Sequence, residues 1–193
     1  MTGRDDSTDE RRAAIVRAAT QVFARYGYRK ASMDEVARAA GLSRQGVYLH
    51  FPAKEQLFHE VVAAVLRAAL AAGEAALADA ALPLEDRLLH AFDAMYGQYV
   101  ESIDSLHIAE LLETSNRLAG GLVDAQEQAF LAAVTVALER AGVAARWAAA
   151  GLTARALAET LQAVAHGLKH HVAARAEFLD RMRIAVRLVA RPA

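Results

Sequence analysis

Residues 32–54 constrain the fold of this chain more than any other stretch, because signals that start and stop helices follow one another closely there. Ser32 is followed three residues later by Glu35, which has the form of a capping box and predicts a helix over residues 33–40. Gly41 follows the last apolar residue of that helix, where a left-handed backbone conformation costs least. The sequence therefore predicts a short helix that ends in a tight turn.

A second short helix is expected directly after this turn. Ser43 is its expected cap, it runs from Arg44 to about His50, and Val47 and Phe51 form its inner side. Arginine and glutamine pair bidentately with guanine and adenine edges in the DNA major groove, and tyrosine and histidine can donate to phosphate. We therefore expect this helix to contact DNA, although an ordinary helical hairpin with a solvated outer face has the same local signals. The expected DNA-binding residues are Ser32, Ser43, Arg44, Gln45, Gly46, Tyr48, His50 and Lys54.

Residues 12–57 resemble the DNA-binding domain of the TetR family of bacterial transcriptional repressors. The family's aromatic-Gly-aromatic step after the first helix is matched by residues 26–28, and its D-[DE]-[IV]-A helix by residues 34–37. The family's A-G-[VL]-S turn is matched by residues 40–43, and the Tyr-x-[HY]-Phe end of its recognition helix by residues 48–51.

This resemblance implies a ligand-responsive transcriptional regulator, a repressor, that binds a pseudo-palindromic DNA operator as a homodimer and is released by a small organic effector. It implies no cofactor. The operator sequence does not carry over, because residues 45–47 and Leu49 lie where the family varies. The expected domains are a disordered tail over residues 1–7, a helix-turn-helix DNA-binding domain over 8–53 and a helical effector-binding and dimerisation domain over 54–193.

The charge of the chain is unevenly distributed. Residues 11–54 carry nine Lys or Arg and two Asp or Glu, a net charge of +7, so the rest of the chain sums to −8 because the whole chain carries −1. A basic segment on an acidic body is typical of nucleic-acid-binding proteins, since bound cationic side chains release counterions condensed on the phosphates.

The composition indicates a soluble chain that we expect in the cytoplasm. There is no cysteine, which excludes disulfides and thiol chemistry. Residues 1–12 lack the apolar core of a signal peptide, and no charge-free apolar stretch approaches the roughly 20 residues that a membrane span needs. We therefore expect no membrane partner.

Apolar residues recur at helical spacing along the rest of the chain. A long fourth helix is expected from Lys54 toward Ala80, and Pro83 separates it from a fifth helix that begins at Leu84 and extends to Ile103. No alternation of apolar and polar residues is long enough for a strand. The expected fold is all-α with about nine helices, divided between an N-terminal three-helix helix-turn-helix domain and a C-terminal helical ligand-binding and dimerisation domain.

The last two predicted helices, near residues 152–173 and 175–190, have apolar faces wider than one core contact requires. Two such helices from each of two chains would form a four-helix bundle about a twofold axis, as in TetR-like proteins. A monomer that uses both helices to close its own core explains the residues equally well. The DNA argument favours the dimer, since a twofold dimer presents two recognition helices about 34–36 Å apart. The expected interface residues are Leu161, Val164, Gly167, Leu168, Phe178, Met182, Ala185 and Val189.

The fourth to seventh predicted helices are expected to hold the effector pocket, and the ligand is expected to be a mainly apolar organic molecule. Aromatic and methionine side chains at helical spacing are more often ordinary core residues, so every member of this set has a core alternative. The expected lining residues are Phe92, Met95, Tyr96, Tyr99, His107, Leu111, Gln126 and Phe130.

His166 and His170 lie one turn apart on a predicted helix and could share a metal ion. A polar stripe at a helix surface explains them better, so no metal site is assigned. The alternative functions are a small helical-bundle metal-dependent enzyme and a helical interaction module without DNA binding. The sequence contains no nucleophile motif and no phosphate-binding glycine loop, which disfavours an enzyme, and the basic N-terminal segment disfavours the interaction module.

Overall fold

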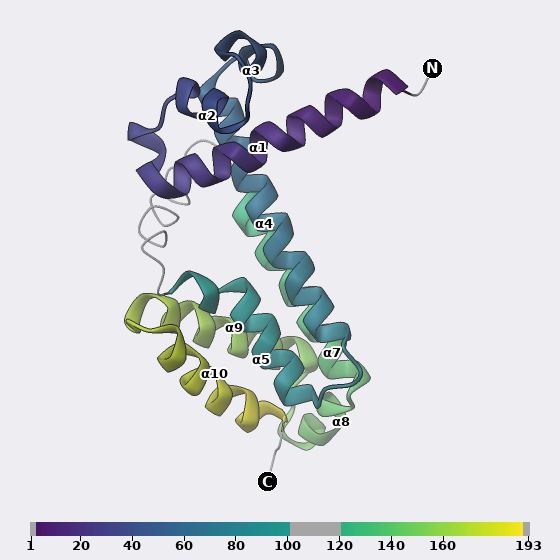
Figure 1. Ribbon diagram of the computed structural model, residues 1–193. Coiled ribbons are helices and arrows are strands. Elements are labelled where there is room, and N and C mark those ends of the chain that lie inside the picture. Colours follow the sequence, from purple (N-terminus) through teal and green to yellow (C-terminus); the bar gives the residue numbers. More distant parts are fainter. Residues whose placement is uncertain (1–2, 101–120, 191–193) are drawn as a thin grey trace. The chain divides into compact units, whose positions relative to one another are not determined.

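The computed structural model describes residues 3–100 and 121–190 (Figure 1). Within those ranges the chain forms nine α-helices and two short 3₁₀ helices, with no strand. The predicted all-α fold is confirmed. The chain divides into two compact units, the first built on Met1–Leu66 and the second on Arg67–Ser102 and Val123–Ala193.

The first unit contains, in order, α1 (Gly3–Lys30), α2 (Met33–Ala39), α3 (Arg44–His50) and the start of α4 (Lys54–Ala78). α1 is interrupted at Gly27, whose φ of 74° and ψ of 158° bend the backbone. After this bend the ring of Tyr28 packs against Phe23 and, with 4.4 Å between the ring centroids, against Phe58. The buried core of the first unit consists of Ile15, Ala19, Val22, Phe23, Ala31, Met33, Val36, Ala37, Val47, Phe51, Leu57, Phe58, Val61 and Val62.

α1 begins earlier than the sequence predicts. We expected a disordered tail over residues 1–7, but the helix already includes Gly3. No proline follows Gly3 within α1, so nothing in the sequence interrupts the helical hydrogen-bond pattern ahead of Ser7. Residues 3–7 are therefore helical rather than disordered, and residues 1–2 lie outside the described residues.

The turn between α2 and α3 has the structure that the sequence predicts. Gly41 adopts a left-handed φ of 68°. Its backbone N–H donates to Arg38 O, and the N–H of Leu42 donates to Ala37 O at 2.9 Å. This pair of bonds is a Schellman motif, which satisfies two carbonyls at the end of α2 and fixes the direction in which the chain leaves it.

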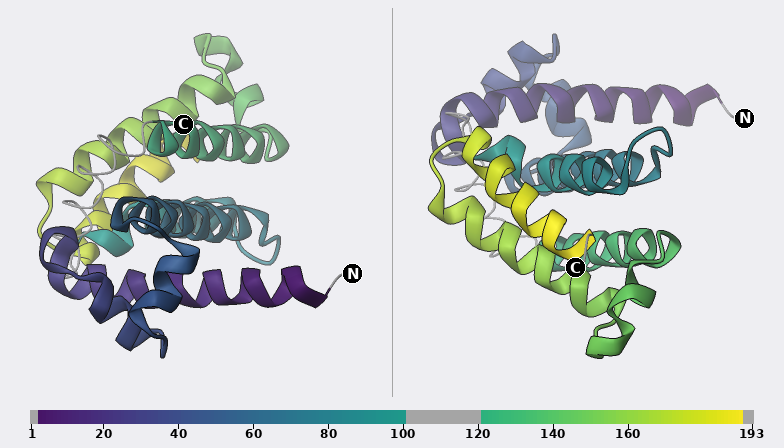
Figure 2. Two further views of the ribbon diagram at one scale, coloured as in Figure 1. Left: turned by 90° about the horizontal axis from the view of Figure 1, so that it is seen from above. Right: turned by 90° about the horizontal axis from the view of Figure 1, so that it is seen from below.

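The second unit is built from the rest of α4 and from α5 (Leu84–Met95), η1 (Gly97–Tyr99), α7 (Leu122–Arg140), α8 (Val143–Trp147), η2 (Ala148–Ala150), α9 (Ala154–His171) and α10 (Arg175–Ala190). α9 and α10 lie side by side (Figure 2), and α10 also packs on α5. Trp147 fixes α8 against α10, since its indole Nε1 donates to Val189 O at 2.8 Å. The largest fully buried side chains of this unit are Leu88, Phe92, Phe130, Leu138, Leu161, Phe178 and Met182.

α5 ends sooner than the sequence predicts. We expected it to continue to Ile103, but it stops at Met95 and is followed by the 3₁₀ turn η1. The backbone leaves the helical conformation at Tyr96, whose φ is −132°, and α10 approaches closely at the next residue, since a Cβ atom at Gly97 would lie 2.9 Å from Cδ1 of Phe178. Ile103 itself lies outside the described residues.

α4 belongs to both units. By length and composition it is apolar enough to cross a membrane, with a mean hydropathy of 1.8 in its most apolar window. Its apolar residues are nevertheless used in the protein core, which is typical of a core helix. Those buried in the first unit are Leu57, Phe58, Val61 and Val62, and those buried in the second are Ala69 and Leu77. The units therefore divide after Leu66, within α4, whereas we expected the boundary at residue 53.

We expect Gly41→Ala to destabilise the protein by about 1–2 kcal/mol, because a Cβ atom disfavours the left-handed conformation. No atom lies within 4 Å of the position that this Cβ would occupy, so a steric clash adds nothing. Gly41→Asn is the matched control and should lose less stability than Gly41→Ala, since asparagine adopts the left-handed conformation more readily than alanine. Urea unfolding followed by circular dichroism measures both losses, and equal losses would contradict the backbone explanation.

Candidate nucleic-acid interface

α3 is positioned by its cap and by its buried inner side. Ser43 Oγ accepts a hydrogen bond from the backbone N–H of Gly46 at 3.1 Å, as the sequence predicts for an N-cap. Val47 and Phe51 are fully buried in the core of the first unit. The opposite face of α3 is open to solvent: Arg44, Gln45 and Leu49 are exposed, and Gly46, Tyr48 and His50 are partly exposed.

Arg44 is held in place before any DNA is bound. Its Nη1 donates to Oδ2 of Asp34 on α2 at 3.1 Å, and its Cζ lies 5.5 Å from the centre of the Tyr48 ring. Both charged side chains of this ion pair are more than half exposed, so the pair contributes little to stability. A guanidinium has five N–H donors, and Asp34 occupies one of them. Sequence reasoning missed Asp34, because only the fold shows that it faces Arg44.

Lys54 lies on an aromatic platform. Its Nζ is 4.4 Å from the centre of the Tyr28 ring, whose neighbour in the core is Phe58. Burial lowers the pKa of Lys54, and burial, with a smaller contribution from Glu55, raises the pKa of Tyr28 to about 12. The bend at Gly27 thus brings Tyr28 under a cation at the start of α4. The DNA contact expected of Lys54 stays a prediction.

Ser32 has a structural role in the cap of α2. Its Oγ accepts from Glu35 N at 3.2 Å, and its own N–H donates to Glu35 Oε2 at 2.7 Å, so the capping box is confirmed. The Ser32 hydroxyl also donates to Glu35 Oε2. Hydrogen bonds from the Ser32 backbone, and then from its side chain, lower the pKa of Glu35. A phosphate contact by Ser32 would have to share or replace these bonds, and it stays a prediction.

Arg12 holds the other end of α3, which sequence reasoning did not anticipate. Its Nη1 donates to the backbone carbonyl of His50 at 2.8 Å, and its Cζ lies 4.3 Å from the centre of the Phe51 ring. Its Nη2 is 3.9 Å from Oε1 of Glu60 on α4. No local pattern could reveal this contact, because Arg12 and His50 are 38 residues apart.

Two shallow hollows open on the first unit. The larger, of about 370 Å³, is lined by Arg12, His50, Phe51, Glu55, Gln56, His59 and Glu60. The smaller, of about 260 Å³, is lined by Gln21, Val22, Arg25, Tyr26, Glu35, Arg38 and Ala39. Carboxylates stand among the cations in each hollow, so neither is a purely cationic phosphate site.

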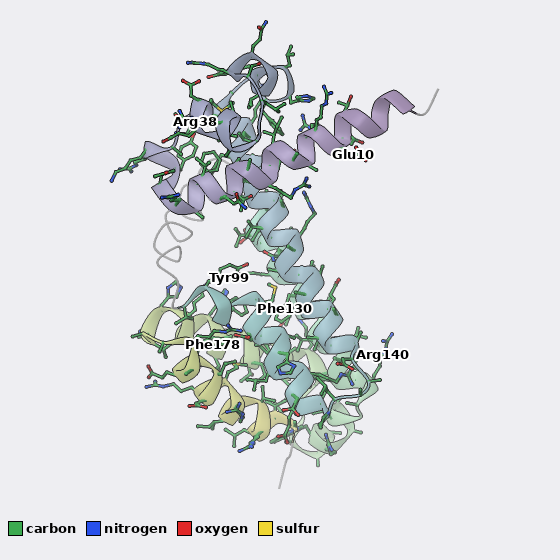
Figure 3. The ribbon with its side chains drawn as sticks, in the orientation of Figure 1. Glu10, Arg38, Tyr99, Phe130, Arg140 and Phe178 are labelled. Atoms are coloured by element: carbon green, nitrogen blue, oxygen red, sulfur yellow. The ribbon has the colours of Figure 1, made fainter. Side chains whose placement is uncertain are left out.

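The structure brings five of the expected effector residues together in the second unit. Phe92 and Phe130 pack edge to face with 5.2 Å between their centroids, and Tyr96 stacks on Phe92 (Figure 3 shows Phe130). The amide Nε2 of Gln126 lies 3.7 Å from Sδ of Met95. Tyr99 is half-buried, and burial raises its pKa. His107 and Leu111 lie outside the described residues.

A polar cluster on α5, α7 and α9 adjoins these aromatic rings. His166 Nε2 and Glu127 Oε1 are 2.7 Å apart, and this hydrogen bond is the main cause of a lowered Glu127 pKa. Lys169 Nζ lies 5.4 Å from the centre of the Tyr96 ring, and burial lowers the pKa of Lys169. Among the described residues, the buried Tyr96 hydroxyl and Gln162 Oε1 make no hydrogen bond of good geometry, although Gln162 lies close enough to Tyr96 to lower its pKa slightly against the dominant effect of burial, which raises it. Sequence reasoning identified Tyr96 and weighed His166, but it missed the other three.

The expected metal alternative finds no support in the described residues. No group of three or more His, Cys, Asp or Glu side chains within residues 3–100 and 121–190 could hold a metal ion. His166 faces Glu127 and the edge of the Tyr96 ring rather than His170. The hydrogen bond to Glu127 thus accounts for the position of His166 without a metal ion.

The expected dimer residues need correction. Leu161, Phe178, Met182 and Val189 are buried within the core of their own monomer, so they have no surface left for a partner (Figure 3 shows Phe178). The apolar period along a helix identifies a buried face but not which molecule buries it. Val164, Leu168 and Ala185 are partly buried against the same core, and Gly167 is exposed. The large apolar side chains exposed on α10 are instead Ile184 and Leu188.

Comparison with known proteins identifies the first unit. Residues 15–61 match the family model described as bacterial regulatory proteins, tetR family. Over 54 residues the chain is 41% identical to the uncharacterized HTH-type transcriptional regulator YfiR of Bacillus subtilis and 44% identical to the HTH-type transcriptional activator FasR of Mycolicibacterium smegmatis. Each match covers 28% of this chain and 26% or 25% of the relative, so the chain matches about a quarter of the length of these curated relatives.

Solved structures extend the likeness of the fold to the second unit. A structure from Mesorhizobium loti assigned to the TetR family of regulators matches with a TM-score of 0.70 and 22% identity, and the match covers 94% of this chain and 96% of that one. A transcriptional regulator from Aquifex aeolicus matches with a TM-score of 0.65 and 17% identity over 93% of this chain and 99% of that one. At these identities the likeness shows the fold.

We expect Arg44→Ala and Lys54→Ala to weaken DNA binding in different ways. Arg44→Ala should cost about 1–3 kcal/mol of DNA-binding free energy and remove discrimination at one operator position, because a guanidinium has donors for a base edge beyond the one that Asp34 occupies. Lys54→Ala should weaken binding to all sequences alike and lower the salt slope by about one unit per half-site.

Binding to single-base operator variants at several salt concentrations separates these two effects. Arg17→Ala is the control, since Arg17 is an exposed cation of α1 outside the expected DNA-binding set. It should leave discrimination at every operator position unchanged. An Arg44→Ala variant that binds every DNA sequence less tightly by the same factor would contradict base reading by Arg44.

Proposed function

We propose that this chain, whose residues 15–61 match the model of the tetR family of bacterial regulatory proteins, is a transcriptional regulator that binds a pseudo-palindromic DNA operator. The observation that carries the proposal is α3, a helix capped by Ser43 and held at its far end by Arg12, with Arg44 and Gln45 on its exposed face. The net charge of +7 over residues 11–54 supplies the attraction to phosphate.

Selection of DNA from a random-sequence pool by the full-length protein tests this function. We expect a duplex with two related half-sites whose centres lie one helical turn, about 10 base pairs, or more apart. Fluorescence anisotropy should then give an affinity at least about a thousandfold above that for scrambled DNA at the same salt concentration. Recovery of no enriched sequence would overturn the proposal, because non-specific binding alone follows from charge.

The proposed direction of regulation is repression, in a cytoplasmic protein. It follows from the family resemblance, although one relative is named an activator. A promoter–reporter fusion that contains the selected operator distinguishes the two directions. Reporter output that falls when the protein is expressed supports repression, and output that rises contradicts it.

We propose that the protein acts as a homodimer through α9 and α10. Ile184 and Leu188 are 62% and 68% exposed and lie one turn apart on α10, so they form an apolar stripe that a partner could cover. On α9 the exposed Ala163 and Gly167 would permit close approach of a second helix. A twofold dimer would match the symmetry of a pseudo-palindromic operator.

We expect Leu188→Glu to give folded monomers, because a charge on an exposed stripe prevents association without entering the core. Sedimentation velocity at micromolar concentration measures the mass, and circular dichroism verifies the fold. Leu152→Glu is the control, since Leu152 is partly exposed but precedes α9, and it should remain dimeric. Phe178→Ala should instead lose about 3–5 kcal/mol of stability, as a fully buried ring does. A dimeric Leu188→Glu protein would contradict this interface.

We also propose that the second unit binds a small, mainly apolar organic effector beside Phe92, Met95, Tyr96 and Phe130. The support is the polar cluster next to these side chains, because the buried Tyr96 hydroxyl makes no hydrogen bond of good geometry to the described residues, and a ligand could supply a better one. α4 contributes to both cores, so a ligand that favours one position of α4 would change operator affinity.

We expect Tyr96→Phe to leave the ligand-free protein as stable as the wild type or to stabilise it by about 1 kcal/mol, since the removed hydroxyl makes no hydrogen bond of good geometry to any described residue. The same substitution should weaken the binding of any organic compound that raises the melting temperature of the wild type and lowers its affinity for the operator. Thermal melting with a panel of such compounds measures both effects. A clear loss of stability in Tyr96→Phe would show that the hydroxyl is already satisfied, and the argument for a ligand there would fail.

A further inference from the structure

The outer face of α3 carries an apolar side chain that neither the fold nor phosphate binding uses. Leu49 is 79% exposed, the largest value among the exposed large hydrophobic side chains of the described residues. Val47, two residues earlier, is fully buried, so α3 directs Val47 into the core and Leu49 into solvent. Sequence reasoning left Leu49 out of the expected DNA-binding set.

Exposed leucines are common on protein surfaces, and it is the position of Leu49 that distinguishes it. Residues four apart on a helix are neighbours on one face, so Leu49 lies next to the exposed Gln45. Arg44 and Tyr48 form the adjoining row, with 5.5 Å between the guanidinium carbon and the ring centre. Four residues of α-helix rise about 6 Å, which corresponds to roughly two base-pair steps of DNA.

The major groove offers an apolar side chain a particular partner. Guanine, adenine and cytosine present hydrogen-bond donors and acceptors at their groove edges, whereas thymine also presents its C5 methyl group. A leucine can neither donate nor accept a hydrogen bond, so base edges other than thymine gain little from it. Contact between Leu49 and a thymine methyl would remove both apolar groups from water.

We propose that Leu49 contacts the C5 methyl group of a thymine in each operator half-site and so specifies thymine within about two base pairs of the base that Gln45 contacts. This inference rests on the proposed function. Leu49 is thereby a specificity-determining residue whose selectivity comes from an apolar contact, whereas that of Arg44 and Gln45 comes from hydrogen bonds.

Replacement of thymine by uracil tests the contact, because uracil differs only by the missing methyl group and keeps all hydrogen bonds of the base pair. The experiment uses the full-length protein and the tightest duplex selected from the random pool, with each thymine position substituted in both half-sites. At one position we expect uracil to weaken binding about threefold to tenfold per half-site, as loss of one buried methyl group predicts. 5-Bromouracil, whose bromine occupies the place of the methyl group, should restore binding at that position.

The Leu49→Ala variant tests the protein side of the same contact. Leu49 is exposed, so the variant should melt at the wild-type temperature and bind the thymine duplex only as tightly as the wild type binds the uracil duplex. It should bind the thymine and uracil duplexes equally. Leu152→Ala, which changes an exposed leucine outside the first unit, should keep the full sensitivity to uracil.

Two results would overturn the inference: a wild-type protein that tolerates uracil at every position, or a Leu49→Ala protein that keeps the wild-type sensitivity. The first of these needs no variant. Failure of the proposed function gives a different outcome, since no duplex would then be enriched from the pool. A selected duplex without a methyl-sensitive position refutes only the role of Leu49.

Discussion

The left-handed turn at Gly41 is the constraint on which the proposed DNA-binding surface depends. The two hydrogen bonds of its Schellman motif end α2, and α3 begins only three residues after Gly41. The direction of α3 is therefore set by a few residues of backbone. Ser43 then fixes the first turn of α3, and Arg12 binds the carbonyl of His50 at its end. A helix of two turns has little stability of its own. The contacts at both ends of α3 and the burial of Val47 therefore supply most of the stability of this helix.

The parts of the fold that depend on neighbouring residues could be predicted from the sequence. The capping box at Ser32, the φ of Gly41 and the break at Pro83 before α5 are local and are confirmed. Contacts between distant residues could not be predicted, since the sequence pattern does not fix how helices register against each other. The bonds from Arg12 to His50 and between Glu127 and His166 each join residues almost 40 positions apart.

The misassigned dimer residues show the same limit in physical terms. A helix with a wide apolar face must bury it, but the energy of burial per unit area is the same against its own chain and against a partner. Phe178 is buried in its own monomer because Gly97 has no side chain and leaves room for the ring. The spacing of apolar residues along α10 cannot reveal this fit between α10 and η1. Ile184 and Leu188 are the large apolar side chains that α10 leaves exposed, which only the packing of its opposite side reveals.

Affinity and specificity are separated on α3 by the charges around it. The excess of seven positive charges over residues 11–54 attracts any DNA, whereas Arg44 is partly neutralised by Asp34. An exposed ion pair is worth at most about 1 kcal/mol, so exchange of the Asp34 carboxylate for a base edge costs little when the base presents matching acceptors. Where the base lacks those acceptors, Arg44 keeps its ion pair with Asp34, and we expect the affinity for DNA to come from the phosphate contacts. The carboxylate on α2 thus sets a threshold: Arg44 exchanges Asp34 for a base edge only where the acceptors of that base outweigh the ion pair.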